Sequence, residues 1–383
     1  MRANIVSEPR ERSEPAKRRV RERAGQAEGR SPSVKRRGVR AATVASAILW
    51  IGALHAATRN VQQELFAPGL LSQTGLYEAS RPGAIARGVR QFSPQYPLWS
   101  DGASKVRWIS LPPGTAIDTT VPGDWTFPVG TKFWKEFSFN GRKAETRFIW
   151  RATADRWIFA SYAWSAEGTD AVLAPEEGLP GVADIAAGKK HDIPAANDCR
   201  ACHGTSRPGP LGFNALQLST DRDPNAIHGE PLAGGMITLA ALQSDGLLSP
   251  SRPEWIASPP RIRTSDPQTR AVLGYFAANC GTCHNSSGEI AYAGPSLKHS
   301  DVAADGDAVA RALLNQATAW QLPGRADGTT RMLDAVAPDA SAMLYRMRSR
   351  RPTSQMPPLG TVLRDEQAIS VISKWIEKDL KKN

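Results

Sequence analysis

Cysteine is scarce in this chain of 383 residues, and so are histidine and methionine. There are four cysteines, six histidines and six methionines, and all four cysteines fall into two short motifs. No cysteine is left for a disulfide framework, and the few histidines leave little material for a hydrolase triad. A glycine-rich phosphate loop is also absent from the sequence. These absences direct attention to the two cysteine motifs.

Positive charge is concentrated at the N-terminus. The formal net charge is +11, but residues 1–40 hold 13 Lys and Arg against five Asp and Glu, so the other 343 residues carry only +3. We therefore expect no basic groove and no nucleic-acid partner. Residues 41–57 follow as a mostly apolar run. We interpret residues 1–57 as a basic leader with a signal peptide or a membrane anchor, and cleavage and tethering both stay open.

The region 58–188 has the pattern of a β-rich domain. Large and polar side chains alternate in KVRWISL, TKFWKEFSF, AETRFIWRA and RWIFASYAW, and Asn140-Gly141 between two such runs predicts a hairpin. Strands at this spacing indicate an antiparallel sandwich or a small barrel. Seven of the eleven tryptophans lie between Trp99 and Trp164. We expect them to alternate into the core, and the alternative is an exposed aromatic platform for a sugar or a partner.

The two cysteine motifs share the pattern C-x-x-C-H. They are Cys199-Arg200-Ala201-Cys202-His203 and Cys280-Gly281-Thr282-Cys283-His284. Two thiols one helical turn apart can form thioethers to the vinyl groups of one haem, and the histidine that follows can ligate its iron. The pattern therefore predicts two covalently bound haem c groups, attached through Cys199, Cys202, Cys280 and Cys283, with His203 and His284 as proximal ligands.

Two other uses of the cysteines fit less well. A single zinc ion could bind two C-x-x-C pairs, but 77 residues separate Cys202 from Cys280, and zinc does not explain a histidine after each pair. A thioredoxin-like pair would follow a strand in a βαβ unit, and neither motif has that context. Because haem is attached covalently outside the cytoplasm, the motifs and the leader together predict a periplasmic protein, soluble or anchored to the inner membrane.

The second motif has helices on both sides in the sequence. Ser265-Asp266-Pro267 predicts a helix start, and that helix runs into Cys280. Residues 365–380 have helical apolar spacing, and the loop around Met356 is rich in proline. The arrangement resembles the class I cytochrome c fold over about residues 263–383, and this resemblance implies that Met356 is the second ligand of the second haem iron.

Three nearby residues are interpreted differently. Met343 and Met347, four apart on an expected helix, are interpreted as core packing, with a ligand role for either one as the alternative. His299 follows a turn-like Gly-Pro-Ser segment between polar neighbours, and we expect it to be a solvated loop residue. The expected distal ligand of the second iron thus stays Met356.

The first haem lacks such a clear distal ligand. Its segment, residues 189–262, has no Met-Pro loop, and Met236 lies on a glycine-hinged stretch before a helix-like run. We predict Met236 as the distal metal ligand, with His228, His191 and an open iron position as alternatives. An open position would favour catalysis at the iron.

Over most of the chain after the leader, the sequence resembles a family of bacterial dihaem c-type cytochromes with an N-terminal β-rich region. The resemblance rests on YPLWSDGASKVRWISLPPGTAI, FPVGTKFWKEFSF, ETRFIW and SYAW, followed by the two C-x-x-C-H motifs. It implies redox work in the periplasm. The expected fold is multidomain α+β, with an antiparallel β-rich N-terminal domain (58–188) and two mainly α cytochrome c-like haem modules (189–262 and 263–383).

The expected function is single-electron transfer between periplasmic electron donor and acceptor proteins. One alternative is a dihaem peroxidase or oxidase that uses an open position at the first haem. The other is a cytochrome that is tethered to a larger complex through a sugar- or partner-binding β domain.

Overall fold

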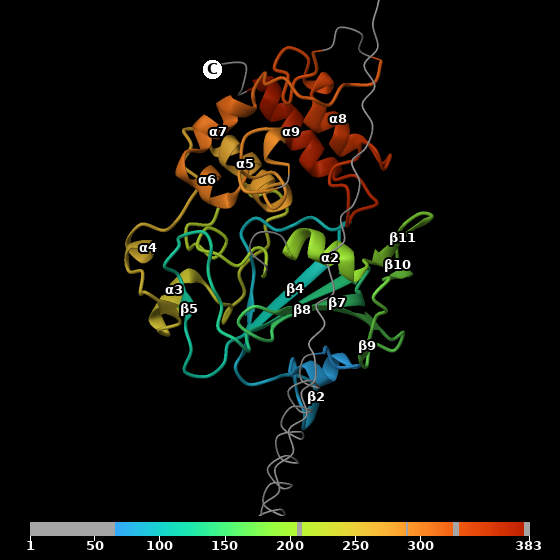
Figure 1. Cartoon of the computed structure of the whole chain (residues 1–383), viewed down its shortest axis with the longest axis vertical. Coiled ribbons are helices and arrows are strands. Elements are labelled where there is room, and N and C mark those ends of the chain that lie inside the picture. Colours follow the sequence, from blue (N-terminus) through green and yellow to red (C-terminus); the bar gives the residue numbers. More distant parts are fainter. Residues whose placement is uncertain (1–65, 205–208, 289, 325–328, 379–383) are drawn as a thin grey trace, which may run out of the picture. The chain divides into compact units, whose positions relative to one another are not determined.

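The computed structural model describes residues 66–204, 209–288, 290–324 and 329–378 (Figure 1). The predicted leader and the apolar run 41–57 lie outside the described residues. All described residues belong to one compact unit, and the predicted boundaries after residues 188 and 262 fall inside it. Within the described part of the chain, no helix is both long enough and apolar enough to cross a membrane. The composition is mixed, with antiparallel sheets in the N-terminal region and helices after them.

A six-stranded antiparallel sheet forms the centre of the β-rich region. Its strand order is β3-β4-β6-β7-β8-β9, so the chain mostly adds each strand beside the previous one. The strands are β3 (Val89–Phe92), β4 (Ser104–Ser110), β6 (Lys132–Phe139), β7 (Arg142–Arg151), β8 (Trp157–Trp164) and β9 (Ala171–Leu173).

The hairpin predicted at Asn140-Gly141 is confirmed. Phe139 pairs with Arg142, so the loop between β6 and β7 consists of Asn140 and Gly141 alone. Asn140 has φ 49° and Gly141 has φ 77°, the left-handed conformation that a tight hairpin turn of this type needs. A register shift between Phe137 and Ser138 follows along β6. That bulge changes which residues of β7 lie opposite the rest of β6.

The two faces of the sheet carry different side chains. On one face, Trp108, Trp134 and Phe148 lie in a cross-strand row and pack with Leu71 of the 3-10 helix Leu71–Thr74. On the other face, a second cluster includes Phe133, which packs with residues of the segment 210–250. The predicted burial of the tryptophans is confirmed, since all seven belong to a core cluster or pack against one: Trp99, Trp108, Trp125, Trp134, Trp150, Trp157 and Trp164.

Three two-stranded sheets accompany the central one. The pairs are β1 (Tyr77–Glu78) with β2 (Arg81–Ile85), β10 (Leu179–Ala186) with β11 (Lys189–Ile193), and the parallel pair β5 (Ile117–Asp118) with β12 (Leu248–Ser249). The last pair joins the β-rich region to the segment after the first cysteine motif. That segment therefore does not fold apart from the sheet.

The segment 189–262 is less helical than predicted. Its described helices are short: α2 (Ala196–His203), α3 (Leu239–Ser244) and α4 (Glu254–Ala257). Frequent glycine and proline interrupt the rest, and its apolar side chains enter the cluster on the sheet face. The expectation of a mainly α module there is wrong, because most of the segment is not helical and its apolar side chains are buried against the sheet.

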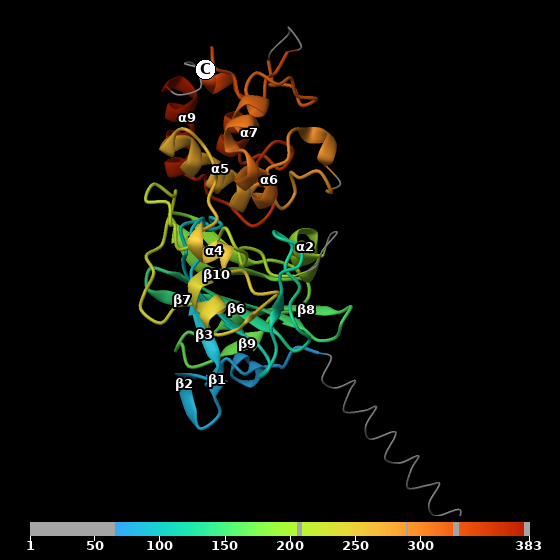
Figure 2. The same ribbon diagram turned by 90° about the vertical axis from the view of Figure 1, so that its left-hand side faces the viewer.

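The C-terminal region is helical, as predicted. Its helices are α5 (Pro267–Asn279), α6 (His299–Ala304), α7 (Gly306–Leu313), α8 (Ala342–Arg348) and α9 (Glu366–Lys378), with 3-10 turns at Ala291–Ala293 and Pro338–Ala340. Asp266 caps α5 by accepting a hydrogen bond from the Thr269 N–H at 2.6 Å. Figure 2 shows α5, α6, α7 and α9 gathered together. Phe276 of α5 meets Trp375 of α9 edge to face, with 6.2 Å between ring centroids.

The β-rich region packs directly on α5. Gly274 of α5 has room only for hydrogen, since a Cβ there would lie 2.1 Å from the ring of Tyr96. The Tyr96 hydroxyl donates to Asp223 at 3.1 Å, so one side chain joins three parts of the chain. This packing places α2 and the end of α5, which carry the two cysteine motifs, in one neighbourhood.

Candidate functional site

The first motif occupies the last two turns of α2. Asp198 accepts a hydrogen bond from the Ala195 N–H at 3.1 Å at the start of the helix, and the Gly204 N–H donates to the Arg200 carbonyl at 2.7 Å at its end. Cys199 and Cys202 are therefore one turn apart on the same side of the helix. This is the spacing that two thioether bonds to one flat ring require.

His203 is held in one tautomer. Its Nδ1 lies 2.8 Å from the Gly209 carbonyl oxygen, which can only accept, so Nδ1 carries the proton and donates. Nε2 is then the atom with the free lone pair, as in metal-ligating histidines oriented by a backbone carbonyl. The ring packs on Phe159 with 5.4 Å between centroids, and burial lowers the pKa of His203 to about 4. The imidazole is neutral at ordinary pH and ready to ligate.

The second motif begins where α5 ends. Cys280 is the C-cap residue of α5, and the His284 N–H donates to the Cys280 carbonyl at 2.9 Å. Gly281 lies against the Leu297 carbonyl oxygen, 2.2 Å from where a Cβ would be, so a larger residue does not fit there. Burial raises the pKa of the Cys280 thiol to about 12. For His284, burial and then the positive charge of Arg346 lower the pKa.

The two motifs meet. Cys202 of the first motif and Cys283 of the second lie close enough for their thiols to interact, although 80 residues separate them in the sequence. This interaction raises the pKa of Cys202 and lowers that of Cys283. The sequence predicts two separate haem modules, whereas the structure brings one cysteine of each motif into the same neighbourhood.

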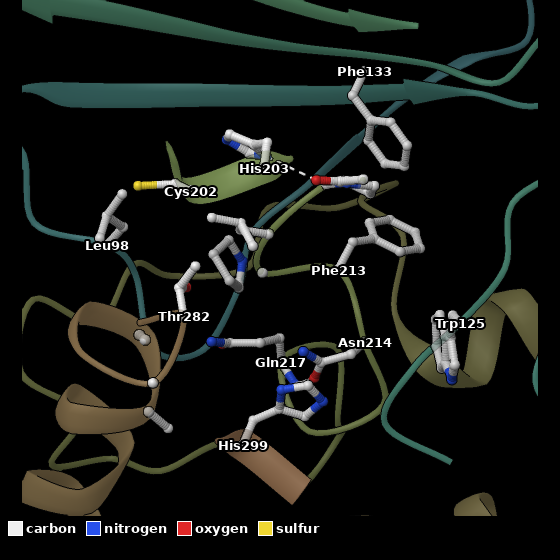
Figure 3. Close-up of a pocket in the computed structure, with 18 of the residues that line it drawn as sticks. Leu98, Trp125, Phe133, Cys202, His203, Phe213, Asn214, Gln217, Thr282 and His299 are labelled. Atoms are coloured by element: carbon white, nitrogen blue, oxygen red, sulfur yellow. Dashed lines mark hydrogen bonds between the residues drawn. The ribbon is translucent and has the colours of Figure 1, made fainter. Parts of the chain in front are cut away.

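A cavity of about 420 Å³ opens beside the first motif. Cys202 and His203 line it, together with Thr282 of the second motif. Figure 3 shows His203 and His299 at opposite ends of the view, with Phe133, Phe213 and Trp125 along one side and Leu98, Cys202 and Thr282 along the other. The cavity therefore joins both motifs and has largely apolar and aromatic walls.

His299 is not the solvated loop residue that the sequence suggested. It is the first residue of α6, it lines the cavity, and its Nε2 is buried without a hydrogen bond of normal geometry among the described residues. Burial lowers the pKa of His299, and an interaction with the Gly123 backbone opposes that shift. Residues distant in the sequence cause this difference from the prediction. The Lys298–Asp124 ion pair at 2.8 Å and the close approach of Gly123 enclose the His299 ring. Of the lining residues, His203 and His299 are the two that offer a nitrogen lone pair to iron.

Met236, the predicted distal ligand of the first site, is not among the residues that line the cavity. It is half-buried, and the N–H of the next residue, Ile237, donates to the Gln91 carbonyl at 2.7 Å. The backbone at Met236 is thus held against the end of β3. The ligand role of Met236 stays a prediction that this placement does not support.

The two histidines considered as alternatives have carboxylate partners. His191 Nε2 lies 2.9 Å from Glu145, and His228 Nε2 lies 2.8 Å from Asp365. Neither residue lines the cavity. Both histidines are therefore engaged in structural hydrogen bonds and are poorly placed to bind a metal in the cavity.

Met356 and His284 are each linked to Arg346. The Met356 N–H donates to the Arg346 carbonyl at 2.9 Å, while the Arg346 charge acts on His284. Met347 is 7% exposed and belongs to the C-terminal core, and Met343 packs against that core, so the expected core packing of both is confirmed. The ligand role of Met356 stays a prediction.

The sequence analysis missed a row of cations on the cavity wall. Arg107, Lys135 and Arg147 come from β4, β6 and β7 and all line the cavity. The alternation of side chains within each strand indicates which face of the sheet each of these cations is on. That the three lie side by side depends on the register between the strands, which the sequence does not give.

Comparisons with known protein families, with curated proteins and with solved structures find no match to this chain. In the described part, no three His, Cys, Asp or Glu side chains form a cluster that could hold a metal ion by themselves. The two motifs and the cavity are therefore the features of the chain that bear on its function.

Proposed function

We propose that the protein is an exported dihaem c-type cytochrome that transfers single electrons between periplasmic donor and acceptor proteins. The observation that carries the proposal is the pair of C-x-x-C-H motifs, whose Cys202 and Cys283 side chains interact beside a cavity that His203 also lines. A porphyrin supplies four nitrogens of its own, so such a site needs only an axial ligand from each motif and no cluster of protein ligands.

The residues at the first motif fit a haem. Cys199 and Cys202 would form the thioethers, and His203 would ligate through Nε2. Aromatic walls suit a large flat apolar ring, and the buried Nε2 of His299, which makes no hydrogen bond of normal geometry, suits a metal ligand. When bound, haem supplies a one-electron Fe(III)/Fe(II) couple.

At the second motif, Cys280, Cys283 and His284 would hold the other haem, with Met356 as the second axial ligand. The support is the resemblance to class I cytochrome c, together with Arg346, whose carbonyl accepts a hydrogen bond from the Met356 N–H and whose charge acts on His284. A methionine ligand favours Fe(II) and raises the potential. The C-terminal segment 263–383 would then be the class I cytochrome c-like domain.

The protein's own residues would keep the iron environments rigid. The Gly209 carbonyl fixes the His203 ring, and the packing of Phe276 on Trp375 fixes α5 against α9. Rigid ligands and buried walls mean that little has to rearrange when charge moves, which suits an electron carrier. The contact between the two motifs suits transfer between the two sites inside one chain.

A second candidate function has one observation in its favour. His299 lines the cavity with its Nε2 unpartnered, and its lowered pKa keeps the ring neutral. A neutral imidazole can act as a base toward a peroxide proton if the iron itself stays open. The protein would then be a dihaem peroxidase or oxidase.

The experiment is a haem count and a spectrum of the purified protein. A pyridine haemochrome assay should find two haems per chain, and replacing Cys199 and Cys202 by Ala should halve that number. Electron paramagnetic resonance of the oxidised protein should find two low-spin haems for the carrier. Zinc without iron in elemental analysis contradicts both functions, and a high-spin haem with peroxide-dependent oxidation of a donor favours the second.

Location can be tested separately. Residues 1–57 would direct export, and residues 41–57 would tether the protein to the inner membrane if they are not cleaved. Cell fractionation should find the haem-containing protein in the periplasmic fraction or in the inner-membrane fraction, and N-terminal sequencing distinguishes cleavage from anchoring. Recovery of the protein in the cytoplasm, without haem, would contradict export.

A further inference from the structure

Three basic residues form a row across the central sheet. Lys135 of β6 lies opposite Arg107 of β4 on one side and opposite Arg147 of β7 on the other. Residues directly opposite in an antiparallel sheet point to the same face, and all three line the cavity next to His203. The row therefore forms a positively charged part of the cavity wall beside the first motif.

Two members of the row have their own carboxylates. Arg107 donates to both oxygens of Glu230, at 2.6 and 3.1 Å, and Arg147 donates to both oxygens of Glu145, at 2.7 and 3.1 Å. Each arginine is thus paired in the bidentate geometry that suits guanidinium and carboxylate. These two charges are compensated within the fold.

Lys135 has no such partner among the described residues. The recorded contact of its Nζ is with the ring of Phe137, 4.8 Å from the centroid. Burial, and then the charges of Arg107 and Lys105, lower the pKa of Lys135. Like charges opposite each other on a sheet destabilise it, and a half-buried cation without a partner, as Lys135 is, costs more than one that is paired. Glu230 is close enough to oppose this effect, but it is already bound to Arg107.

We propose that Lys135 binds a carboxylate of the group that fills the cavity, which on the proposed function is a propionate of the first haem. The inference rests on that function for the identity of the group, and on the cation row for its chemistry. A Lys135–propionate pair would neutralise negative charge near the first iron. Because the reduced iron carries less positive charge than the oxidised iron, the lysine would favour Fe(II) and raise the potential of the first haem.

The test compares three variants of the full-length holoprotein by spectroelectrochemical titration. Lys135→Gln removes the charge, Lys135→Arg keeps it, and Lys132→Gln is the matched control. Lys132 lies three residues earlier on β6, so it points to the opposite face, where its Nζ donates to the Thr74 carbonyl at 2.8 Å. We expect Lys135→Gln to shift the Fe(III)/Fe(II) equilibrium of one haem about tenfold toward Fe(III), or about 59 mV. Lys135→Arg and Lys132→Gln should leave both potentials near the wild-type values.

Several outcomes separate the possibilities. Loss of one haem from Lys135→Gln, but not from Lys135→Arg, also supports a carboxylate held by charge. Unchanged potentials in Lys135→Gln overturn the proposal, and so does loss of haem from both Lys135 variants, because packing then explains the residue. If added sulfate at constant ionic strength shifts the wild-type potential but not that of Lys135→Gln, the lysine binds a free anion and the propionate assignment is overturned. A wild-type protein without two haems contradicts the proposed function itself.

Discussion

His299 and Met236 are rival candidates for the second ligand of the first haem iron. His299 lines the cavity with an unpartnered Nε2, whereas Met236 does not line it. If His299 is the second axial ligand of the first iron on the carrier function, we expect His299→Ala to convert one low-spin haem to high spin and to permit cyanide binding. Met236→Ala should leave the spin state unchanged. Optical and electron paramagnetic resonance spectra measure both, and the reverse pattern would restore Met236 as the ligand.

The second iron is tested through its methionines. We expect Met356→Ala to abolish the absorption band of iron–thioether ligation and to lower the potential of that haem, because a thioether favours Fe(II). Met347→Ala should keep the band and cost about 2–5 kcal/mol of unfolding free energy, because Met347 is buried in the C-terminal core. Loss of the band in Met347→Ala alone would assign the ligand to α8.

At the scale of strands, Glu145 makes the sheet sensitive to acid. Burial alone would raise the pKa of Glu145, but the Arg147 charge and the His191 hydrogen bond outweigh burial and lower it to about 2. A lowered carboxyl pKa stabilises the fold above the ordinary value near 4.5, and this stabilisation is lost as the pH falls from about 4.5 to about 2. We expect the unfolding free energy to fall in this window, as measured by urea denaturation.

The matched variant for this acid effect is Glu145→Gln. It leaves Arg147 and His191 without their carboxylate, which should cost about 3–5 kcal/mol at neutral pH. It should also flatten the pH dependence between pH 4.5 and 2, the window that Glu145 titration defines. A pH dependence as steep as that of the wild type would show that other carboxyl groups control the acid response.

At the scale of helices, Asp365 connects α9 to two other parts of the chain. Its side chain accepts hydrogen bonds from the Ala368 N–H at 3.0 Å, from the Tyr275 hydroxyl at 2.9 Å and from His228 Nε2 at 2.8 Å. Asp365→Ala removes a helix cap and leaves two buried polar groups unpaired, which we expect to cost about 2–5 kcal/mol of unfolding free energy. Asp365→Asn can still cap α9, so its cost should be smaller, and equal costs would contradict the capping role.

Elements with local signals were predictable from the sequence, and features that depend on distant contacts were not. The turn at Asn140-Gly141 and the start of α5 at Asp266 follow from the preferences of a few adjacent residues. The row of cations that includes Lys135 depends on the bulge between Phe137 and Ser138, which the adjacent residues do not predict. His299 is enclosed by the loop of Gly123, more than 170 residues earlier, so its burial also has no local signal.

At the scale of the whole molecule, the sequence indicates two C-x-x-C-H motifs but not that they are neighbours in space. The interaction between Cys202 and Cys283 links α2, which packs on the sheet, to the segment that follows α5 of the C-terminal core. On the proposed function, one thioether sulfur of each haem would lie in neighbouring positions. A change of charge at one haem should therefore change the reduction potential of the other.

We expect the two haems to titrate with negative cooperativity. Reduction of one iron removes a positive charge from the neighbourhood of the second, so the second electron should be harder to add. In a redox titration followed by absorbance, the wild-type curve should be broader than the sum of the one-electron curves of two single-haem variants. The double variant Cys199→Ala and Cys202→Ala keeps only the second haem, and the double variant Cys280→Ala and Cys283→Ala keeps only the first. A wild-type curve that equals the sum of these two single-haem curves, at low and at high ionic strength, would show that the neighbouring motifs do not couple the haems electrostatically.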